Sequence, residues 1–291
     1  MIDQIELLPL GSCAGDINTY QKFSAYLLNF YHIIISEAGK ESRELDAQIL
    51  LDAGNDRIFD EHWIKPEKLS GIFLSHGHFD HTLAIGKLCA FLQQKKRTQP
   101  LPIYFPIHAA LKIRSLIKMR NKFKIPPFVE FHPIYPNIKE IRFNNNVIVQ
   151  PYPAIHTIPC LSYKFLITKT GSTLSLVYTP DTRIDSTNLI EQTKDVDYWM
   201  LDTTFDDAFY DKLLQNPKKR SMMLRYQHST PKYSAMLCQT AQVKTYIVIH
   251  YYWRRFNLEY SKVKEIIVQA AQKEFSGRVI VTEDLHPILL E

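Results

Sequence analysis

The chain has 291 residues, of which 45% are hydrophobic and 22% are charged. This length supports one large domain or two small ones, and the composition is that of a soluble globular protein. The formal net charge of +5 is uneven, because residues 82–129 contain ten Lys and Arg and no Asp or Glu, which leaves −5 for the rest of the chain. This asymmetry predicts an anionic partner, usually a nucleic acid, with a solvated basic face of a helical hairpin as the alternative.

Neither the start of the chain nor its apolar runs predict a secreted or membrane protein. The first six residues carry acids where a signal peptide would carry Lys or Arg. The apolar run from Tyr26 to Ile35 is interrupted by Asn29 and His32 and is too short to cross a bilayer. The four scattered cysteines favour small buried thiols over a disulfide framework or a zinc finger. We therefore expect a cytoplasmic protein without membrane contact.

The first half of the chain is predicted to form four strands followed by two helices. Apolar or alternating stretches bounded by turn residues predict strands over residues 4–10, 24–35, 47–51 and 71–75. Apolar residues then recur at helical spacing, so an amphipathic helix is expected from Thr82 to about Gln94. A second helix, around residues 109–122, carries most of the basic side chains.

The second half repeats the pattern of strands followed by helices. Strands are predicted over residues 147–152, 161–168, 172–179, 199–203 and 245–250. Thr230 and Pro231 form a typical N-cap and first-turn pair, which opens a helix through about Ala241. Another helix spans residues 261–275, with Gly277 as its left-handed stop and residues 279–282 as the final strand.

Two sets of strands, each followed by helices, predict an α+β fold. The two sheets should pack face to face with helices on both outer faces, as an αββα four-layer sandwich. The sequence contains no internal repeat and no low-complexity linker, so residues 1–291 are expected to form one domain.

The segment from His76 to His81 reads His-Gly-His-Phe-Asp-His and places four ligand-type side chains after a predicted strand, just before the helix that is expected to begin beyond His81. These side chains can converge if the backbone turns sharply, for which Gly77 is suited. Imidazole suits zinc, and a neighbouring carboxylate can complete a second site. A lone histidine is usually an ordinary core or surface group, but that interpretation does not explain three histidines and an aspartate so close together. The segment therefore predicts metal binding.

This cluster alone would serve two metal ions incompletely, so further ligands are expected at the ends of later strands. His156 follows the strand at 147–152, Asp181 follows the strand at 172–179, and His250 closes the strand at 245–250. Side chains directly beyond hydrophobic strands are held by a rigid scaffold.

The histidine cluster, followed in order by His156, Asp181 and His250, resembles the metallo-β-lactamase superfamily, and within it the ribonuclease Z branch. The stretch Asp181-Thr182-Arg183 is similar to the Gly-Asp-Thr-Arg of that branch, with proline in place of glycine. Residues 227–230 are similar to its His-Ser-Thr helix start, and residues 249–256 to its Thr-His-Phe-Ser-x-Arg-Tyr segment. The resemblance implies the metallo-β-lactamase fold and a metal-dependent hydrolase.

By this resemblance, seven side chains hold two divalent metal ions, which would be Zn²⁺, with Mn²⁺ or Fe²⁺ as alternatives. The first ion would be bound by His76, His78 and His156, the second by Asp80, His81 and His250, and Asp181 would bridge them together with a hydroxide. Two such cations lower the pKa of a shared water and stabilise both the attacking and the leaving oxygen of a phosphodiester. Asp52 is expected either to hydrogen-bond a ligand from behind or to be a turn residue before Gly54.

The same resemblance implies a catalytic group of Asp80, His228 and Asp202. His228 would donate a proton to the leaving oxygen, against the alternative that it only starts a helix. The His-Glu-Ala-Thr stretch of the family reads Leu-Asp-Thr-Thr at residues 201–204, so Asp202 would orient His228 with a shorter side chain. The other five histidines receive no role.

Ribonuclease Z enzymes that process tRNA usually carry a long arm between the third histidine and the bridging aspartate. Here His156 and Asp181 are 25 positions apart, which leaves room only for a strand hairpin. The glycine-rich loop that begins at Gly11 is also altered. Residues 82–129 are a candidate replacement for the arm as an RNA grip.

Four functions follow in order of preference. The first is an RNA phosphodiesterase, with pre-tRNA 3′-end processing as the leading case, and the second is a cyclic-nucleotide phosphodiesterase, which the missing arm favours. The third is a hydrolase of thioesters or lactones. The fourth is a catalytically dead, metal-free binding subunit, which the complete set of ligand-type residues disfavours. The resemblance also implies a homodimer.

Overall fold

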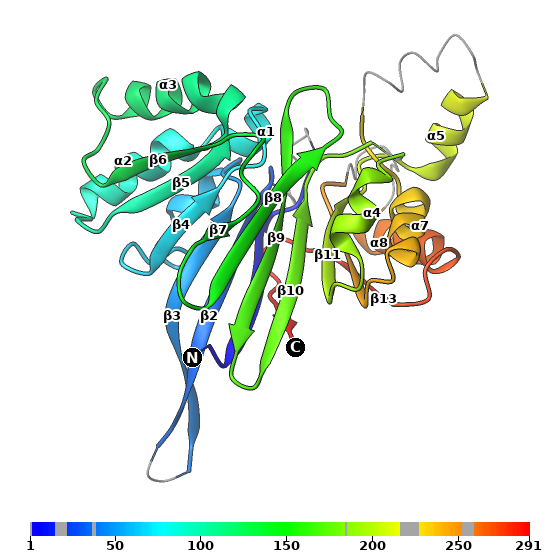
Figure 1. Cartoon of the computed structure of the whole chain (residues 1–291), viewed down its shortest axis with the longest axis horizontal. Coiled ribbons are helices and arrows are strands. Elements are labelled where there is room, and N and C mark those ends of the chain that lie inside the picture. Colours follow the sequence, from blue (N-terminus) through cyan, green and yellow to red (C-terminus); the bar gives the residue numbers. More distant parts are fainter. Residues whose placement is uncertain (1, 15–21, 37–38, 184, 216–226, 252–258) are drawn as a thin grey trace.

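The computed structural model describes residues 2–14, 22–36, 39–183, 185–215, 227–251 and 259–291. In these residues two sheets of seven strands lie face to face, and helices cover both outer faces (Figure 1). The strand order is β14-β1-β2-β3-β4-β5-β6 in the first sheet and β13-β12-β11-β10-β9-β8-β7 in the second. The expected α+β, αββα four-layer sandwich is confirmed.

Each sheet combines antiparallel and parallel strands. The first consists of β1 (Gln4–Gly11), β2 (Ala25–Ile35), β3 (Glu41–Leu51), β4 (Leu69–Phe73), β5 (Leu101–Pro106), β6 (Val129–Ile134) and β14 (Ile288–Leu290). The second consists of β7 (Ile141–Arg142), β8 (Val147–Ala154), β9 (Cys160–Lys169), β10 (Ser172–Thr179), β11 (Tyr198–Asp202), β12 (Thr245–Ile249) and β13 (Arg278–Val281).

The helices form two outer layers. The α-helices are α1 (Phe79–Thr82), α2 (Ile85–Gln94), α3 (Ala110–Arg120), α4 (Asn188–Thr193), α5 (Asp207–Leu214), α7 (Pro231–Thr240) and α8 (Tyr260–Gln272), and the 3-10 turns are η1 (Asp56–Phe59) and η2 (Ile107–Ala109). No helix of the described segments is long and apolar enough to cross a membrane.

Three hydrophobic clusters separate the four layers. The central cluster lies between the sheets and includes Phe73, Tyr163 and Phe165, all fully buried. A second cluster packs α2 and α3 against the first sheet, and a third packs α4, α7 and α8 against the second. Because side chains alternate along a strand, Ile72 faces the helices while its neighbour Phe73 faces the opposite sheet.

The parallel strands bring the ends of distant segments to one edge of the sandwich. β3, β4, β5 and β6 run parallel in the first sheet, and β10, β11, β12 and β13 run parallel in the second. Loops at the carboxyl ends of such strands meet at one edge, where binding and catalytic groups commonly lie.

One expectation near the histidine cluster is wrong in detail. The helix begins at Phe79 instead of after His81, so Asp80 and His81 lie in its first turn, and it is interrupted before α2 begins at Ile85. The backbone bends at Gly77 as expected, and it does so without a left-handed φ angle at this glycine. The ligands converge because a short helix follows the strand.

Four strands were not expected from the sequence. β5 and β6 contain proline, which is uncommon inside a sheet and weakens the strand signal. β7 has two residues, and the three-residue β14 pairs with β1, so residues 279–282 are not the final strand. Gly277 is not left-handed either; a side chain there would lie 2.3 Å from the Phe275 ring, so the glycine serves close packing.

The ten basic residues of the segment 82–129 do not form one solvated face. Arg97 is buried, and its guanidinium donates to the carbonyl oxygens of three surrounding residues. Lys95 pairs with Glu61, and Arg114 stacks on the ring of Phe131. Part of the positive charge therefore serves the fold.

Replacing Phe73 with alanine should destabilise the sandwich strongly. The ring stacks on Tyr104 at a centroid distance of 4.6 Å and meets Tyr163 and Phe165 edge-on at 5.4 Å. We expect Phe73→Ala to lower the free energy of unfolding by about 3–5 kcal/mol, because a buried cavity remains. Urea denaturation measures this. The control Leu111→Ala, at a side chain that is 82% exposed, should change it by less than about 0.5 kcal/mol.

Candidate metal centre

Four segments at one edge of the sandwich supply the seven ligand-type side chains. His76 and His78 follow β4, and Asp80 and His81 lie in α1. The remaining three, His156, Asp181 and His250, follow β8, β10 and β12. The structure thus brings together all seven residues that the sequence singled out.

The first group consists of His76, His78, His156 and one oxygen of Asp181. His78 Nδ1 lies 2.9 Å from His76 Nε2 and 3.1 Å from His156 Nε2. Asp181 Oδ2 lies 3.4 Å from His76 Nε2 and 3.3 Å from His156 Nε2. Four donor atoms therefore surround one point.

The second group consists of Asp80, His81, His250 and the other oxygen of Asp181. Asp181 Oδ1 lies 3.3 Å from the Nε2 atoms of both His81 and His250, which are 3.2 Å apart. Asp80 Oδ2 lies 3.6 Å from His81 Nε2 and 3.4 Å from His250 Nε2. The two oxygens of Asp181 thus connect the two groups.

The donor atoms fit a pair of divalent cations. Ligands about 2.0–2.1 Å from a tetrahedral zinc ion lie roughly 3.3 Å from one another, and both groups have this spacing. Asp181 is almost fully buried, and its Oδ1 receives no hydrogen bond although two ring nitrogens lie nearby. A buried carboxylate oxygen without a donor is costly unless a cation meets it.

Electrostatics differ between the two groups. Burial lowers the pKa of His156 to about 4, so this ring is neutral and its lone pair is available at pH 7. Burial also opposes a charge on His250, but the carboxylate of Asp181 and its acidic neighbours raise the pKa of His250 to about 10. The second group therefore favours positive charge more strongly than the first.

Asp52 holds one ligand from behind. Its Oδ2 lies 2.6 Å from His81 Nδ1 and accepts from the hydroxyls of Ser75 and Tyr178 at 2.7 Å, while Oδ1 accepts from the amide of Ser75. Asp52 is fully buried, so the hydrogen-bonding alternative describes it better than a surface turn. These contacts fix the ring of His81 with Nε2 directed at the second group.

Other histidines are oriented in the same way. His76 Nδ1 lies 2.9 Å from the hydroxyl of Ser75, and His250 Nδ1 lies 3.0 Å from the hydroxyl of Thr204. His156 Nδ1 lies 3.1 Å from the carbonyl oxygen of Gln227. The supporting roles of Ser75, Thr204 and Tyr178 were not expected from the sequence. The hydroxyl of Tyr178 lies within the buried end of β10, which was the available signal for that residue.

Backbone strain is concentrated beside the donor groups. His250 and Asp52 have φ angles of 53° and 56°, in the left-handed region that ordinary side chains avoid. Such residues persist where the surrounding structure fixes them, commonly at functional sites. Gly54 lets α1 approach, because a Cβ at this position would lie 1.8 Å from the carbonyl oxygen of Asp80.

His228 and Asp202 form a pair beside the metal-ligand groups. His228 Nδ1 lies 2.8 Å from Asp202 Oδ2, and the ring lies 5.1 Å from that of His156 and 5.4 Å from that of His250. Asp202 is buried, and although burial disfavours its charge, His228 keeps the pKa of this carboxyl below its ordinary value. The shorter aspartate therefore still reaches the histidine.

A comparison with family models matches residues 47–251 to the beta-lactamase superfamily domain. That range covers most of the chain and includes all seven ligand-type residues. The chain belongs to the metallo-β-lactamase superfamily. The resemblance stated from the sequence is thereby confirmed at the level of the superfamily.

Curated relatives point to the ribonuclease Z branch. A protein of Methanococcus maripaludis named ribonuclease Z is 32% identical over 130 residues, which are 43% of this chain and 41% of that protein. The chain thus matches about two fifths of the length of this curated relative.

Solved structures share the fold over almost the whole chain. The metallo-β-lactamase fold protein YhfI of Bacillus subtilis superposes with a TM-score of 0.71 and 18% identity, covering 99% of this chain and 100% of its own. Human tRNase Z, short form, gives a TM-score of 0.69 and 17% identity, covering 97% and 98%.

The structure describes the segment between His156 and Asp181 completely and the segment at 249–256 only in part. The interval between His156 and Asp181 contains the hairpin of β9 and β10, as the spacing indicated, and no arm. Of the segment at 249–256, only Ile249, His250 and Tyr251 lie within the described residues, and residues 15–21, beyond the altered loop at Gly11, also lie outside them.

Zinc content should depend on Asp181 and not on His228. Asp181→Ala removes both oxygens that connect the two groups, so we expect the content to fall from two zinc ions per chain to one or none. His228→Ala should retain two. Elemental analysis after gel filtration measures both. An Asp181→Ala protein with the wild-type zinc content would contradict the bridging arrangement, and zinc loss from His228→Ala would make His228 a ligand.

Metal affinity of the two groups should respond differently to pH. In protein stripped by a chelator, a cation at the second group must displace the proton that His250 holds, since its pKa is raised to about 10. Affinity there should therefore rise about tenfold or more per pH unit between pH 6 and 9. His156, with a pKa lowered to about 4, adds no such dependence to the first group. Calorimetric zinc titrations at several pH values test this; equal pH dependence of the two binding steps would contradict it.

Proposed function

We propose that this protein is a metal-dependent phosphodiesterase that cleaves RNA, with the 3′ processing of pre-tRNA as the leading case. The observation that carries the proposal is the pair of His228 and Asp202 next to two donor groups that share Asp181. A binding protein needs no oriented proton donor at such a place, whereas a phosphodiesterase does.

In this proposal His76, His78 and His156 would hold one cation and Asp80, His81 and His250 the other, with Asp181 between them, which the grouping of their donor atoms supports. Bound cations would neutralise charge on a phosphodiester and lower the pKa of water. The histidine and carboxylate donors accept Zn²⁺, Mn²⁺ or Fe²⁺.

His228 handles the proton of the leaving group. Asp202 Oδ2 accepts from Nδ1–H of His228, which fixes the ring and leaves Nε2 as the atom that carries the transferable proton. Asp202 is in turn held by the amides of Thr182 and Thr204. A fixed carboxylate partner holds His228 in the orientation that a general acid needs.

RNA as substrate is supported by the curated relative named ribonuclease Z and by the likeness to human tRNase Z. The charge asymmetry of residues 82–129 supports a polyanionic partner. The four cysteines are buried, which agrees with the reduced thiols of the proposed cytoplasmic location. A homodimer and a single domain over residues 1–291 remain predictions that gel filtration and limited proteolysis would test.

Zinc- or manganese-loaded protein should cleave a pre-tRNA and bis(p-nitrophenyl) phosphate, and Asp80→Ala should cleave neither. Activity on cyclic mononucleotides alone would favour the cyclic-nucleotide phosphodiesterase instead. If the protein cleaves no phosphodiester, the proposal is contradicted. A hydrolase of thioesters or lactones, or a binding protein, would then be favoured.

His228→Ala separates proton donation from metal binding. The RNA leaving oxygen needs a proton, so we expect kcat on pre-tRNA to fall about 10²- to 10⁴-fold. The 4-nitrophenolate of bis(p-nitrophenyl) phosphate is a stable anion and needs none, so kcat there should change little. Asp202→Asn should show the same contrast more weakly. Equal losses on both substrates would contradict the general-acid role.

A further inference from the structure

The loop that follows α3 adopts a conformation that its residues disfavour. Lys122 and Phe123 have φ angles of 53° and 60°, and the amide of Phe123 donates to the carbonyl oxygen of Lys118 at 2.8 Å. Helix ends of this kind usually carry glycine, which adopts the left-handed conformation without strain. Folding alone does not explain why two large side chains occupy these positions.

Asn121 fixes this loop to the body of the protein. Its side chain is buried, and Nδ2 donates to the carbonyl oxygens of Ile117 in α3 and Gly86 in α2. The strained loop is thereby fixed relative to both helices. The backbone from which Lys122, Phe123 and Lys124 project is therefore anchored to both helices.

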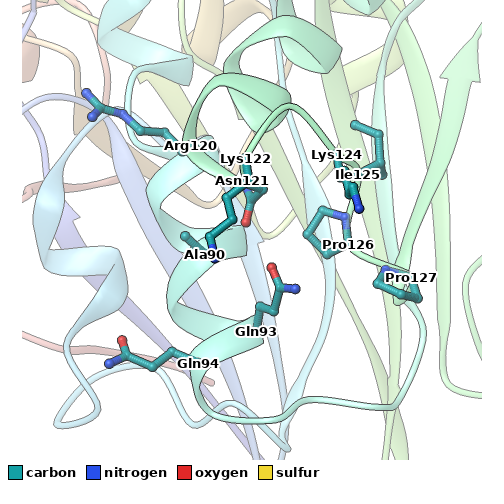
Figure 2. Close-up of a pocket in the computed structure, with 10 residues that line it drawn as sticks. All are labelled: Ala90, Gln93, Gln94, Arg120, Asn121, Lys122, Lys124, Ile125, Pro126 and Pro127. Atoms are coloured by element: carbon teal, nitrogen blue, oxygen red, sulfur yellow. The ribbon is translucent and has the colours of Figure 1, made fainter.

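A cavity of about 800 Å³ lies between this loop and α2 (Figure 2). Arg120, Lys122 and Lys124 line it together with the amides of Gln93 and Gln94. Among the described residues that line it there is no Asp or Glu. The cavity therefore presents cations and neutral donors to an anion.

Phe123 adds an aromatic surface beside these cations. Its side chain is 80% exposed, although a ring of this size is normally buried. An exposed aromatic ring that lies between two lysines in the chain suits a nucleic acid, because bases can stack on the ring while phosphates meet the cations. The ring reaches a base only if that base is unpaired.

Helix α3 connects this cavity to the metal centre. At its first turn, the ammonium group of Lys112 lies 3.7 Å from the centroid of Phe79, the residue between His78 and Asp80. Arg120 lies eight positions further along the helix, which is about 12 Å at the usual rise. A chain bound at the metal centre needs only a few nucleotides to reach the cavity.

We propose that residues 120–124 and this cavity form a second RNA-binding site, which holds the backbone of a single-stranded segment and stacks one base on Phe123. The choice of RNA as the ligand rests on the proposed RNA phosphodiesterase function. The site would bind RNA at a distance from the reacting phosphate, which is the task of the long arm in ribonuclease Z enzymes. In this chain the hairpin between His156 and Asp181 is too short for that task.

Fluorescence anisotropy with a labelled, phosphorothioate-stabilised oligoribonucleotide tests the site in the metal-loaded protein. Phe123→Ala should weaken binding roughly 5- to 150-fold without changing its salt dependence, and Phe123→Trp should retain binding. Lys122→Gln/Lys124→Gln should reduce the slope of log affinity against log salt by about 1.4, since two phosphate contacts are lost. All three variants should hydrolyse bis(p-nitrophenyl) phosphate at the wild-type rate.

Matched controls are Lys262→Gln on α8 and Ile35→Ala at the end of β2, both at exposed positions far along the chain from the loop. RNA affinity of the loop variants equal to that of these controls would overturn the proposal. Displacement of the RNA by equimolar inorganic phosphate would also overturn it and indicate a small-anion site. Wild-type protein that binds RNA through Phe123 but cleaves no phosphodiester would contradict the proposed function and leave this site standing.

Discussion

The structure depends on one buried carboxylate. Asp181 is placed between two groups of histidines, with each of its oxygens about 3.3 Å from ring nitrogens of a different group. Burial disfavours its charge, but the surrounding histidines hold the pKa of Asp181 well below its ordinary range. An ionised carboxylate in a dry site needs positive charge beside it, from a bound cation or a protonated imidazole, and a backbone that keeps every donor in place.

The sandwich supplies that backbone. The segments after β4, β8, β10 and β12 meet at one edge, and buried partners such as Asp52 and Thr204 then orient the rings. The left-handed conformations of Asp52 and His250 show that the fold accepts strain at this edge. The three hydrophobic clusters supply the stability that offsets the backbone strain at Asp52 and His250. Neither residue belongs to a cluster, so the strain does not disturb the packing there.

The candidate metal centre and the proposed RNA-binding cavity lie on different parts of the molecule. His228 and Asp202 adjoin the donor atoms at one edge of the sandwich. Charge and exposed aromatic surface lie on the α2 and α3 layer, where Arg97 serves the fold and Arg120, Lys122 and Lys124 line a cavity. Separate placement lets substrate affinity change without disturbing the metal ligands.

The sequence by itself determined the α+β sandwich, the superfamily and the identity of the seven ligand-type residues. Periodicity and the close spacing of His76 to His81 are local signals, and each later candidate directly follows an apolar strand. The tertiary structure decided which donors share a point, which residues support them and which cations reach solvent. Those properties depend on side chains far apart in sequence, such as Tyr178 against Asp52, and on backbone angles, such as those of Lys122 and Phe123. Neither the long-range side-chain contacts nor these backbone angles produce a local pattern in the sequence.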